Sequence, residues 1–278
     1  MSNKLRVLAF TAHDDDVSIH TGGFIGACVD RGHEVFVQVM TLGQRDQRLP
    51  QFENKLAWDV RKAETLAAYA AYGIEPRFDL VQFEQEVDIT QQRRNLVKNY
   101  IAEVKPDVFL SHWPVDVNPD HRASAVLMME SAYQRGVNPE IIFFQPHSAG
   151  RQSAATRPQV TCFIPTYYLP MTAALIERKR KATFCHVSQD PEGMWAGQNR
   201  TEEENLADVR EHFPDFLPGV NQAEAYIAGK RAGSMIPGLR EILTPTPFTL
   251  PRSVVRHDPS AYGVNEPSTL APVAQAAE

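Results

Sequence analysis

Two short clusters of histidine and aspartate could carry chemistry in this sequence. The first is His13-Asp14-Asp15-Asp16, and the second is Asn118-Pro119-Asp120-His121. Adjacent carboxylates repel one another, so burying any of them requires a cation or hydrogen-bond donors. A divalent metal would meet this need, because imidazole nitrogen and carboxylate oxygen are ligands that suit zinc. The alternative for the first cluster is a solvated acidic turn at the start of a helix, where the helix dipole favours aspartate.

The candidate metal ligands are His13, Asp16 and His121. A catalytic zinc site needs about three protein ligands and an open position for water, and these residues would supply the three. Asp120 could orient a ligand or a partner by accepting a hydrogen bond. Asp15 would remain free of the metal and could act as general base, because the metal lowers the pKa of its water. For His121 taken alone, a solvated surface histidine is the alternative.

The elements that position these clusters alternate between strands and helices. Strands are predicted at residues 4–11, 34–40, 78–83, 107–112 and 141–145, and helices at 18–31, 58–72, 90–105 and 122–135. This alternation predicts an α/β fold with a Rossmann-like, mostly parallel sheet flanked by helices. Both clusters follow predicted strands. Because ligands of parallel sheets bind beyond the carboxyl ends of the strands, we expect the clusters to face each other.

The pattern loosens after residue 145. An extended segment is predicted at 160–169, a helix at 171–184, and further helices at 205–212 and 222–230. Residues 246–278 are rich in proline and alanine. We therefore expect a single catalytic domain over residues 1–245, followed by an extended or mobile C-terminal tail.

Composition and charge narrow the class of protein. Of the 278 residues, 43% are hydrophobic and 22% charged, and the formal net charge of -6 comes without a basic stripe, which disfavours a nucleic-acid partner. The apolar runs are shorter than the ~18 residues that span a bilayer, and the sequence opens without a signal-peptide pattern. The 3 cysteines form no Cys-x-x-Cys pair. We expect a cytoplasmic protein with no membrane partner, and a homo-oligomer is left open.

The ordered set of motifs resembles the LmbE-like/PIG-L family of zinc-dependent N-acetylglucosaminyl deacetylases. The resemblance extends over about Lys4 to Gln189. It is carried by Ala12-His13-x-Asp15-Asp16 with Gly22-Gly23, by Pro119-Asp120-His121, by Arg61 and Glu64, and by Lys181, His186, Ser188 and Gln189, with a weaker echo at Ala223-Glu224-Ala225-Tyr226. It implies zinc at His13, Asp16 and His121, Asp15 as the base, and a small-molecule N-acyl substrate.

Two positions depart from the family pattern. Asp14 stands where the family usually has proline, and we expect it to be a bystander. Asn118 stands where the family often has a histidine that helps to stabilise the oxyanion. An amide N–H can donate to an oxyanion but cannot serve as an acid. His112 could take that place, although it could equally be an ordinary residue at a strand end.

Substrate contacts are harder to assign from sequence. The resemblance suggests that His186 contacts substrate or supports the site, whereas a histidine stabilised by a helix C-terminus is the alternative. Arg45, after the second predicted strand, could bind a substrate hydroxyl or phosphate, and a solvated loop arginine is the alternative.

These features together predict a zinc-dependent hydrolase. The bond cleaved would be an N-acyl amide, with N-acetyl as the first expectation. The amine would be small and can contain a sugar. Asp15 would act as general base. Two alternatives stay open: a non-catalytic metal- or ligand-binding protein on the same fold, and a metal-dependent hydrolase of a non-acetyl C–N bond. A serine hydrolase is disfavoured because the sequence has no Gly-x-Ser-x-Gly motif.

Overall fold

The computed structural model describes residues 4–46, 48–49, 52–116, 118–132, 139–144, 166–189, 223–228 and 235–245. All of these residues belong to the first of the two units into which the chain divides, Met1–Thr246. The helix predicted at 205–212 and the tail predicted at 246–278 lie outside the described residues. The division into a domain and a tail therefore stays a prediction.

A sheet of seven strands, in the order β2-β1-β5-β6-β8-β7-β9, forms the centre of this unit. Its first four strands run parallel: β2 (Glu34–Val39), β1 (Arg6–Thr11), β5 (Val108–His112) and β6 (Glu140–Phe144). Every residue of β5 and β6 is buried, as expected of parallel strands that are covered on both faces. The predicted α/β fold, with its parallel sheet flanked by helices, is confirmed.

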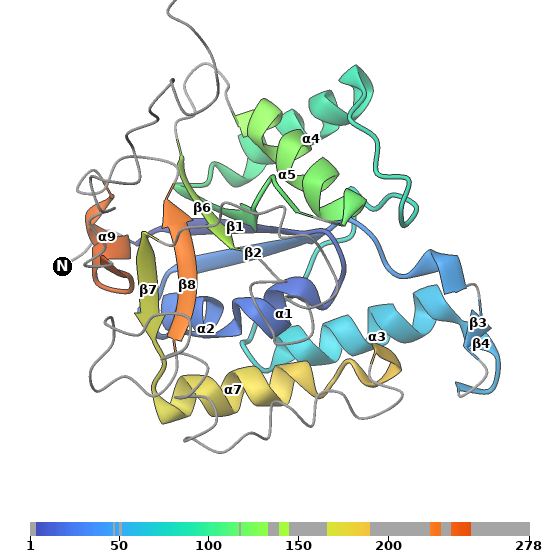
Figure 1. Ribbon diagram of the computed structural model, residues 1–278, viewed down its shortest axis with the longest axis horizontal. Helices are drawn as coiled ribbons and strands as arrows, with labels where there is room; N and C mark the ends of the chain where they lie inside the picture. The colour runs from blue at the N-terminus through green and yellow to red at the C-terminus, as the bar shows by residue number, and fades with distance from the viewer. Residues whose placement is uncertain are drawn as a thin grey trace, which may run out of the picture. The chain divides into compact units, whose positions relative to one another are not determined.

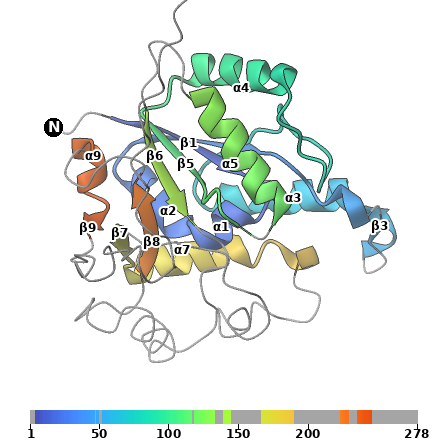
Figure 2. The same cartoon turned by 45° about the horizontal axis from the view of Figure 1, so that its top comes forward.

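Helices cover both faces of the parallel strands (Figures 1 and 2). One face carries α4 (Gln91–Val104) and α5 (Pro119–Ala132), and the other carries α1 (Asp16–His20), α2 (Gly22–Asp30), α3 (Ala57–Ala70) and α7 (Ala173–Thr183). Successive side chains of a strand point to opposite faces. Accordingly, Leu8 and Phe10 of β1 pack in the core under α4 and α5, whereas Val7 and Ala9 pack in the core under α2 and α7.

The other three strands extend the sheet in the antiparallel sense. β8 (Ala223–Ala228) pairs with both β6 and β7 (Tyr167–Pro170), and β7 pairs with β9 (Thr244–Pro245) next to α9 (Pro237–Arg240). The helix predicted at 222–230 is therefore wrong. Alanine and glutamate favour a helix there, but pairing with two neighbouring strands overrides this local preference.

Two other predicted elements differ in the structure. The helix predicted at 18–31 is broken at Thr21, whose hydroxyl donates to the carbonyl of Val17 at the junction of α1 and α2. The strand predicted at 78–83 is wrong, because only an isolated bridge between Gln38 and Arg77 forms beside β2. A small two-stranded sheet, β3 (Arg48–Leu49) with β4 (Lys55–Leu56), lies between the 3-10 turn η1 (Gln44–Asp46) and α3.

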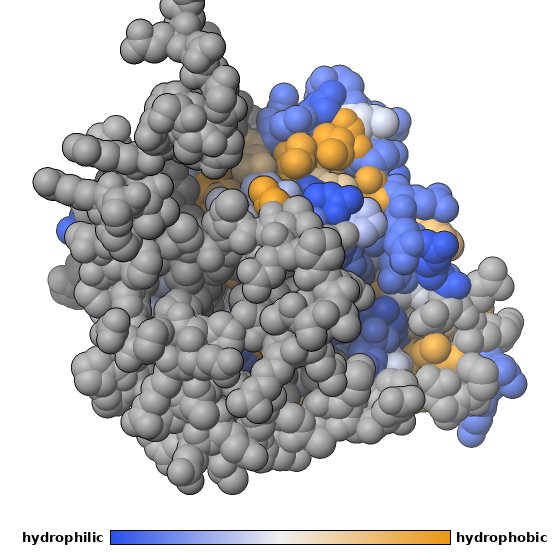
Figure 3. Space-filling model, viewed as in Figure 1, coloured by the Kyte–Doolittle hydropathy of each residue, from blue (hydrophilic) through white to orange (hydrophobic). Residues whose placement is uncertain are grey.

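The surface of the described residues carries both hydrophilic and hydrophobic side chains. Where the face in Figure 3 is coloured, it is mostly hydrophilic with separate hydrophobic spots. The large hydrophobic side chains exposed among the described residues are Leu56, Leu66, Phe83, Leu96, Val115 and Val187. None of the described helices has both the length and the apolar composition needed to cross a bilayer.

Candidate metal centre and active site

The two predicted clusters meet at the carboxyl ends of neighbouring strands. His13 and Asp16 follow β1, and His121 lies in the first turn of α5 after β5. Because β1 and β5 pair in parallel, their carboxyl ends lie at the same edge of the sheet. His13, Asp16 and His121 each bring one potential ligand atom within 4.8 Å of the others.

The three side chains converge on one point. His13 Nδ1 lies 3.1 Å from His121 Nε2 and 3.2 Å from Asp16 Oδ2. Asp16 Oδ1 lies 3.4 Å from His121 Nε2. Asp16 and His121 are buried. The side chain of His13 is 12% exposed, so the cluster is accessible to solvent at His13.

A carboxylate lies behind each of the two histidines. His13 Nε2 is 3.3 Å from Asp120 Oδ2, and His121 Nδ1 is 3.2 Å from Asp116 Oδ2. Such carboxylates accept from the rear N–H and fix the tautomer, which leaves the front nitrogens unprotonated. Asp120 therefore lies where an orienting carboxylate would. Sequence reasoning missed Asp116, although an acidic residue in the loop between β5 and α5 was the available signal.

The electrostatics of the cluster fit a cation. Burial raises the pKa of Asp16, but the facing His121 and His13 outweigh it and hold that pKa well below its usual range. Burial lowers the pKa of His121, but Asp16 outweighs it and raises the pKa to about 9. The site thus favours positive charge beside Asp16. Two imidazole nitrogens and one carboxylate oxygen form a donor set that suits a divalent metal such as zinc.

His112 supports this cluster from within the protein. Its side chain is fully buried, and its ring stacks on that of His121 with centroids 4.2 Å apart. Its Nε2 accepts the backbone N–H of Ala12 at 2.9 Å, and burial together with the charge of His121 lowers the pKa of His112 to about 4. The geometry gives His112 the position of a packing partner of His121. Its predicted role towards the substrate or the oxyanion stays a prediction.

Asn118 begins α5. Its Oδ1 accepts from the backbone N–H of Asp120 at 2.8 Å and lies 3.5 Å from that of His121. Asparagine at this position, with proline at the first helical residue, is a favoured way to start a helix. This cap explains why α5 begins before the predicted residue 122. The cap uses the acceptor Oδ1 and leaves the donor group Nδ2 of Asn118 for an oxyanion, and that role stays a prediction.

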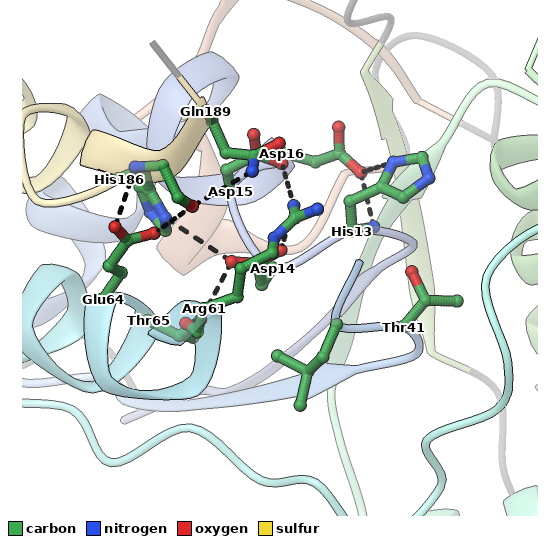
Figure 4. Close-up of polar contacts among 12 residues, drawn as sticks. His13, Asp14, Asp15, Asp16, Thr41, Arg61, Glu64, Thr65, His186 and Gln189 are labelled. Carbon is green, nitrogen blue, oxygen red and sulfur yellow. Dashed lines mark hydrogen bonds and ion pairs between the residues drawn. The ribbon is translucent and has the colours of Figure 1, made fainter. Parts of the chain in front are cut away.

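Asp14 and Asp15 differ sharply in their surroundings (Figure 4). Asp15 keeps 15% of its side-chain exposure and lies 3.9 Å from Arg61. Burial and the adjacent Asp14 and Asp16 raise the pKa of Asp15. Asp14 is fully buried and forms an ion pair with Arg61. Asp14, which was expected to be a bystander in the chemistry, thus has a buried partner, Arg61, from the distant helix α3.

The segment after α7, which contains His186 and Ser188, contacts α1 and α3 in the same region. His186 is fully buried, and its Nε2 lies 2.8 Å from the hydroxyl of Ser18. In the 3-10 turn η3 (Val187–Gln189), Ser188 donates to Glu64 twice, from its backbone N–H at 2.8 Å and from its hydroxyl at 2.6 Å. These contacts attach η3 to α1 and α3. Since His186 is fully buried, a supporting position fits it better than the predicted contact with substrate.

Arg45 lies on the short turn η1 and its side chain is exposed. Among the described residues, no hydrogen bond or ion pair joins it to His13 or His121, and its predicted role in binding substrate stays a prediction. Neighbouring Gln44 is better anchored, since its Nε2 donates to the carbonyl of Gln82 at 3.1 Å.

A family model matches residues 8–132, and its description is "PIG-L: GlcNAc-PI de-N-acetylase". The matched segment runs from β1 to the end of α5 and so contains all the residues of the His13–Asp16–His121 cluster. His186 and Ser188 lie beyond it. The predicted resemblance to the LmbE-like/PIG-L family is confirmed.

Several solved structures share the fold. N,N'-diacetylchitobiose deacetylase from Pyrococcus horikoshii aligns with a TM-score of 0.61 and 22% identity, over 87% of each chain. The hydratase GalB from Pseudomonas putida, which acts on 4-carboxy-2-hydroxymuconate, aligns with a TM-score of 0.65 and 20% identity, over 84% of this chain and 99% of its own. The A40926 pseudoaglycone deacetylase Dbv21 aligns with a TM-score of 0.61 and 19% identity, over 81% of this chain and 98% of its own.

Proposed function

We propose that this chain, whose residues 8–132 match the PIG-L family model, is a metal-dependent hydrolase of an N-acyl amide. The preferred acyl group would be acetyl, on a small amine that can contain a sugar. The observation that carries this proposal is the convergence of His13, Asp16 and His121 at the strand ends. The deacetylases among the structural neighbours support it, since the same fold holds that chemistry in those proteins.

The residues that would hold the metal are His13, Asp16 and His121. A bound divalent ion would supply Lewis acidity to the amide carbonyl and to a water molecule. The chain itself keeps both imidazoles oriented, through Asp120 behind His13 and Asp116 behind His121. Zinc is our proposal for the ion, on the basis of the nitrogen and oxygen donors.

Asp15 would move the protons. Its carboxylate is partly exposed beside the cluster, and its raised pKa suits a group that takes and returns a proton. It would accept a proton from the water whose oxygen adds to the acyl carbon. It would then return that proton to the amine nitrogen as the C–N bond breaks, so the products are a carboxylic acid and a free amine. Asn118 Nδ2 would donate to the oxyanion.

The test is acetate release by the full-length, zinc-loaded protein from a panel of N-acetylated amino sugars, including N-acetylglucosamine and N,N'-diacetylchitobiose. We expect release from at least one member, and we expect Asp15→Asn to lower kcat by about a hundredfold or more with an unchanged zinc content. Asp30→Asn, in an ion pair with Arg178 on the outside of α2, is the matched control and should behave as the parent. Full activity of Asp15→Asn would remove Asp15 from the mechanism.

A second candidate reaction follows from one specific neighbour. GalB is a hydratase and aligns over almost its whole length, so this fold also holds a reaction that adds water across a carbon–carbon double bond. The same metal ligands and base would serve either reaction. Loss of ultraviolet absorbance from an unsaturated polycarboxylate, without acetate release from the panel, would favour hydration. Zinc binding without either reaction would favour the non-catalytic alternative.

A further inference from the structure

A buried group of charged side chains lies directly behind Asp15. Its centre is Asp14, which is fully buried. The Asp14 carboxylate forms an ion pair with Arg61 through Oδ1. Its Oδ2 accepts from the hydroxyl of Thr65 at 3.1 Å and faces His186 Nδ1 at 3.6 Å. These partners come from α3 and from the segment after α7, so Asp14 joins three parts of the chain.

The hydrogen bonds around His186 indicate which of its nitrogens carry protons. The Ser18 hydroxyl donates its one proton to the carbonyl of Asp15 at 2.8 Å. Its oxygen must then accept from His186 Nε2–H, 2.8 Å away. His186 Nδ1 faces Asp14, which favours a proton there as well. Burial lowers the pKa of His186, but its contact with Asp14 outweighs burial and raises that pKa, with Asp15 and Glu64 adding to the effect.

Asp14 is thus the counter-ion of the buried Arg61 and the carboxylate that faces His186 Nδ1. A buried charge without a partner is strongly unfavourable, so Arg61 depends on this carboxylate. Without the Asp14 carboxylate, Arg61 would have Asp15 as its nearest carboxylate, at 3.9 Å in the present geometry.

Arg61 is held on its other side by backbone. Gly43 has a positive φ of 64°, and a Cβ atom added to it would collide with the guanidinium of Arg61. Only a residue without a side chain leaves room for Arg61 at this place. The guanidinium is therefore confined between Gly43 and Asp14, beside Asp15 but paired to Asp14.

We propose that Asp14 is a positioning residue of this site, whose buried carboxylate holds Arg61 so that it does not close on Asp15 and holds the His186 ring against α1. The proposal rests on the proposed function of Asp15 as general base. It assigns a role in this chain to the position at which the family pattern is broken. Asp14 acts through Arg61, and the substrate does not touch it.

The first arm of the test needs no substrate. The pKa of His186 is measured by ¹H–¹⁵N NMR of the full-length, zinc-loaded protein, with His186→Gln to assign the signal. We expect Asp14→Asn, which keeps the size but loses the charge, to lower that pKa by about one unit or more. Asp30→Asn, which removes a carboxylate from an ion pair outside the site, should leave it unchanged. An unchanged pKa in Asp14→Asn would overturn the counter-ion role.

The second arm separates positioning from general damage. With a substrate from the N-acetyl panel, we expect Asp14→Asn to lower kcat about tenfold or more and to change KM by less than about threefold. In the Arg61→Gln background, the same substitution should lower kcat by clearly less, because Asp14 then has no guanidinium to hold and only its contact with His186 is lost. The double variant lacks both charges of the Asp14–Arg61 ion pair. Equal losses in both backgrounds would overturn the proposal.

The two proposals fail in different ways. If no substrate is turned over, the proposed hydrolase is contradicted, while the His186 titration still decides the counter-ion role. The same pair of backgrounds can then be compared by melting temperature. Asp14→Asn should lower it by about 5 °C or more in the parent and by clearly less in Arg61→Gln, and equal shifts would overturn the link to Arg61.

Discussion

At the scale of single residues, each candidate ligand histidine is held between the cluster and a carboxylate. The front nitrogens, His13 Nδ1 and His121 Nε2, face one another and Asp16, while the rear nitrogens face Asp120 and Asp116. The rear carboxylates make the front nitrogens available as ligands. Without them the rings could rotate, and the front nitrogens could carry protons instead of lone pairs.

We therefore predict that Asp116→Asn and Asp120→Asn each weaken zinc binding by about ten- to a hundredfold, because each replaces the charged carboxylate that orients one histidine by a neutral amide, a weaker acceptor. The affinity is measured by competition with a chromogenic chelator at constant pH. Asp30→Asn serves as control, because its carboxylate pairs with Arg178 outside the site. If both variants bound zinc as the parent does, the rear carboxylates would have no part in orienting the ligands.

The sequence predicted best those site residues whose side chains can bind a metal and whose positions follow the end of a strand. His13, Asp16 and His121 could be grouped because each follows a strand end, and the parallel pairing of β1 with β5 brings strand ends together. Asp14 could not be understood in this way. Its partner Arg61 lies on α3, and no local pattern shows that the two meet in the folded chain.

At the scale of elements, Gly43 in the segment between β2 and α3 leaves room for the side chain of Arg61. Gly43 and Gly73 both have positive φ, 64° and 69°, but only the side-chain position of Gly43 is filled, by Arg61. We predict that Gly43→Ala lowers the free energy of unfolding by clearly more than Gly73→Ala. The strain of about 1 kcal/mol for the left-handed backbone is common to both variants.

Urea denaturation of the two variants measures this difference, and the acetate assay follows its consequence. We expect Gly43→Ala to lose activity, since Arg61 must move, and Gly73→Ala to keep it. Equal stability and equal activity of the two variants would contradict the confinement of Arg61 by Gly43.

His33, which directly precedes β2, makes the stability of the protein depend on pH. His33 Nδ1 accepts the backbone N–H of Leu5 at 3.3 Å, and burial lowers the pKa of His33. The folded state then binds this proton less readily than the unfolded chain. The free energy of unfolding should therefore decrease as the pH falls through about 6.5.

This effect can be isolated with His33→Gln, whose amide oxygen can still accept from Leu5. Urea denaturation of zinc-loaded protein at pH 8 and pH 5.5 should show a smaller loss of stability in the variant than in the parent. The same loss in both proteins would exclude His33 as the source.

Elements with strong local signals were predicted, and those that depend on distant pairing were not. β1, β2, β5 and β6 are apolar runs, and α4 follows Thr90, whose hydroxyl accepts from Arg93 N–H as an N-cap. β8 was predicted as a helix, because its strand conformation depends on β6 and β7, which lie far away in the sequence. The false strand at 78–83 is buried only in part and has no pairing partner beyond the bridge at Arg77.

At the scale of the whole molecule, the cluster links the two ends of the family-matched segment. His13 lies near its beginning and His121 near its end, so an ion bound to both would favour the folded chain over the unfolded one. At free zinc of about a hundred times Kd, this linkage adds about 2.7 kcal/mol. We predict that removing zinc with a chelator lowers the melting temperature by about 5 to 10 °C.

His121→Ala is the control for this shift, since it removes one candidate ligand from the folded state. Its melting temperature should respond only weakly to zinc or chelator. A shift as large as that of the parent would mean that zinc stabilises the protein at another place.

The identity of the ligands is the central feature of the proposed metal site, and zinc-edge X-ray absorption of the full-length protein with one equivalent of zinc tests it directly. We predict a shell of nitrogen and oxygen at about 2.0–2.1 Å, with the multiple-scattering signal of two imidazoles, and the loss of one imidazole in His121→Ala. A sulfur shell at about 2.3 Å, or a spectrum unchanged by His121→Ala, would contradict a metal site built from His13, Asp16 and His121.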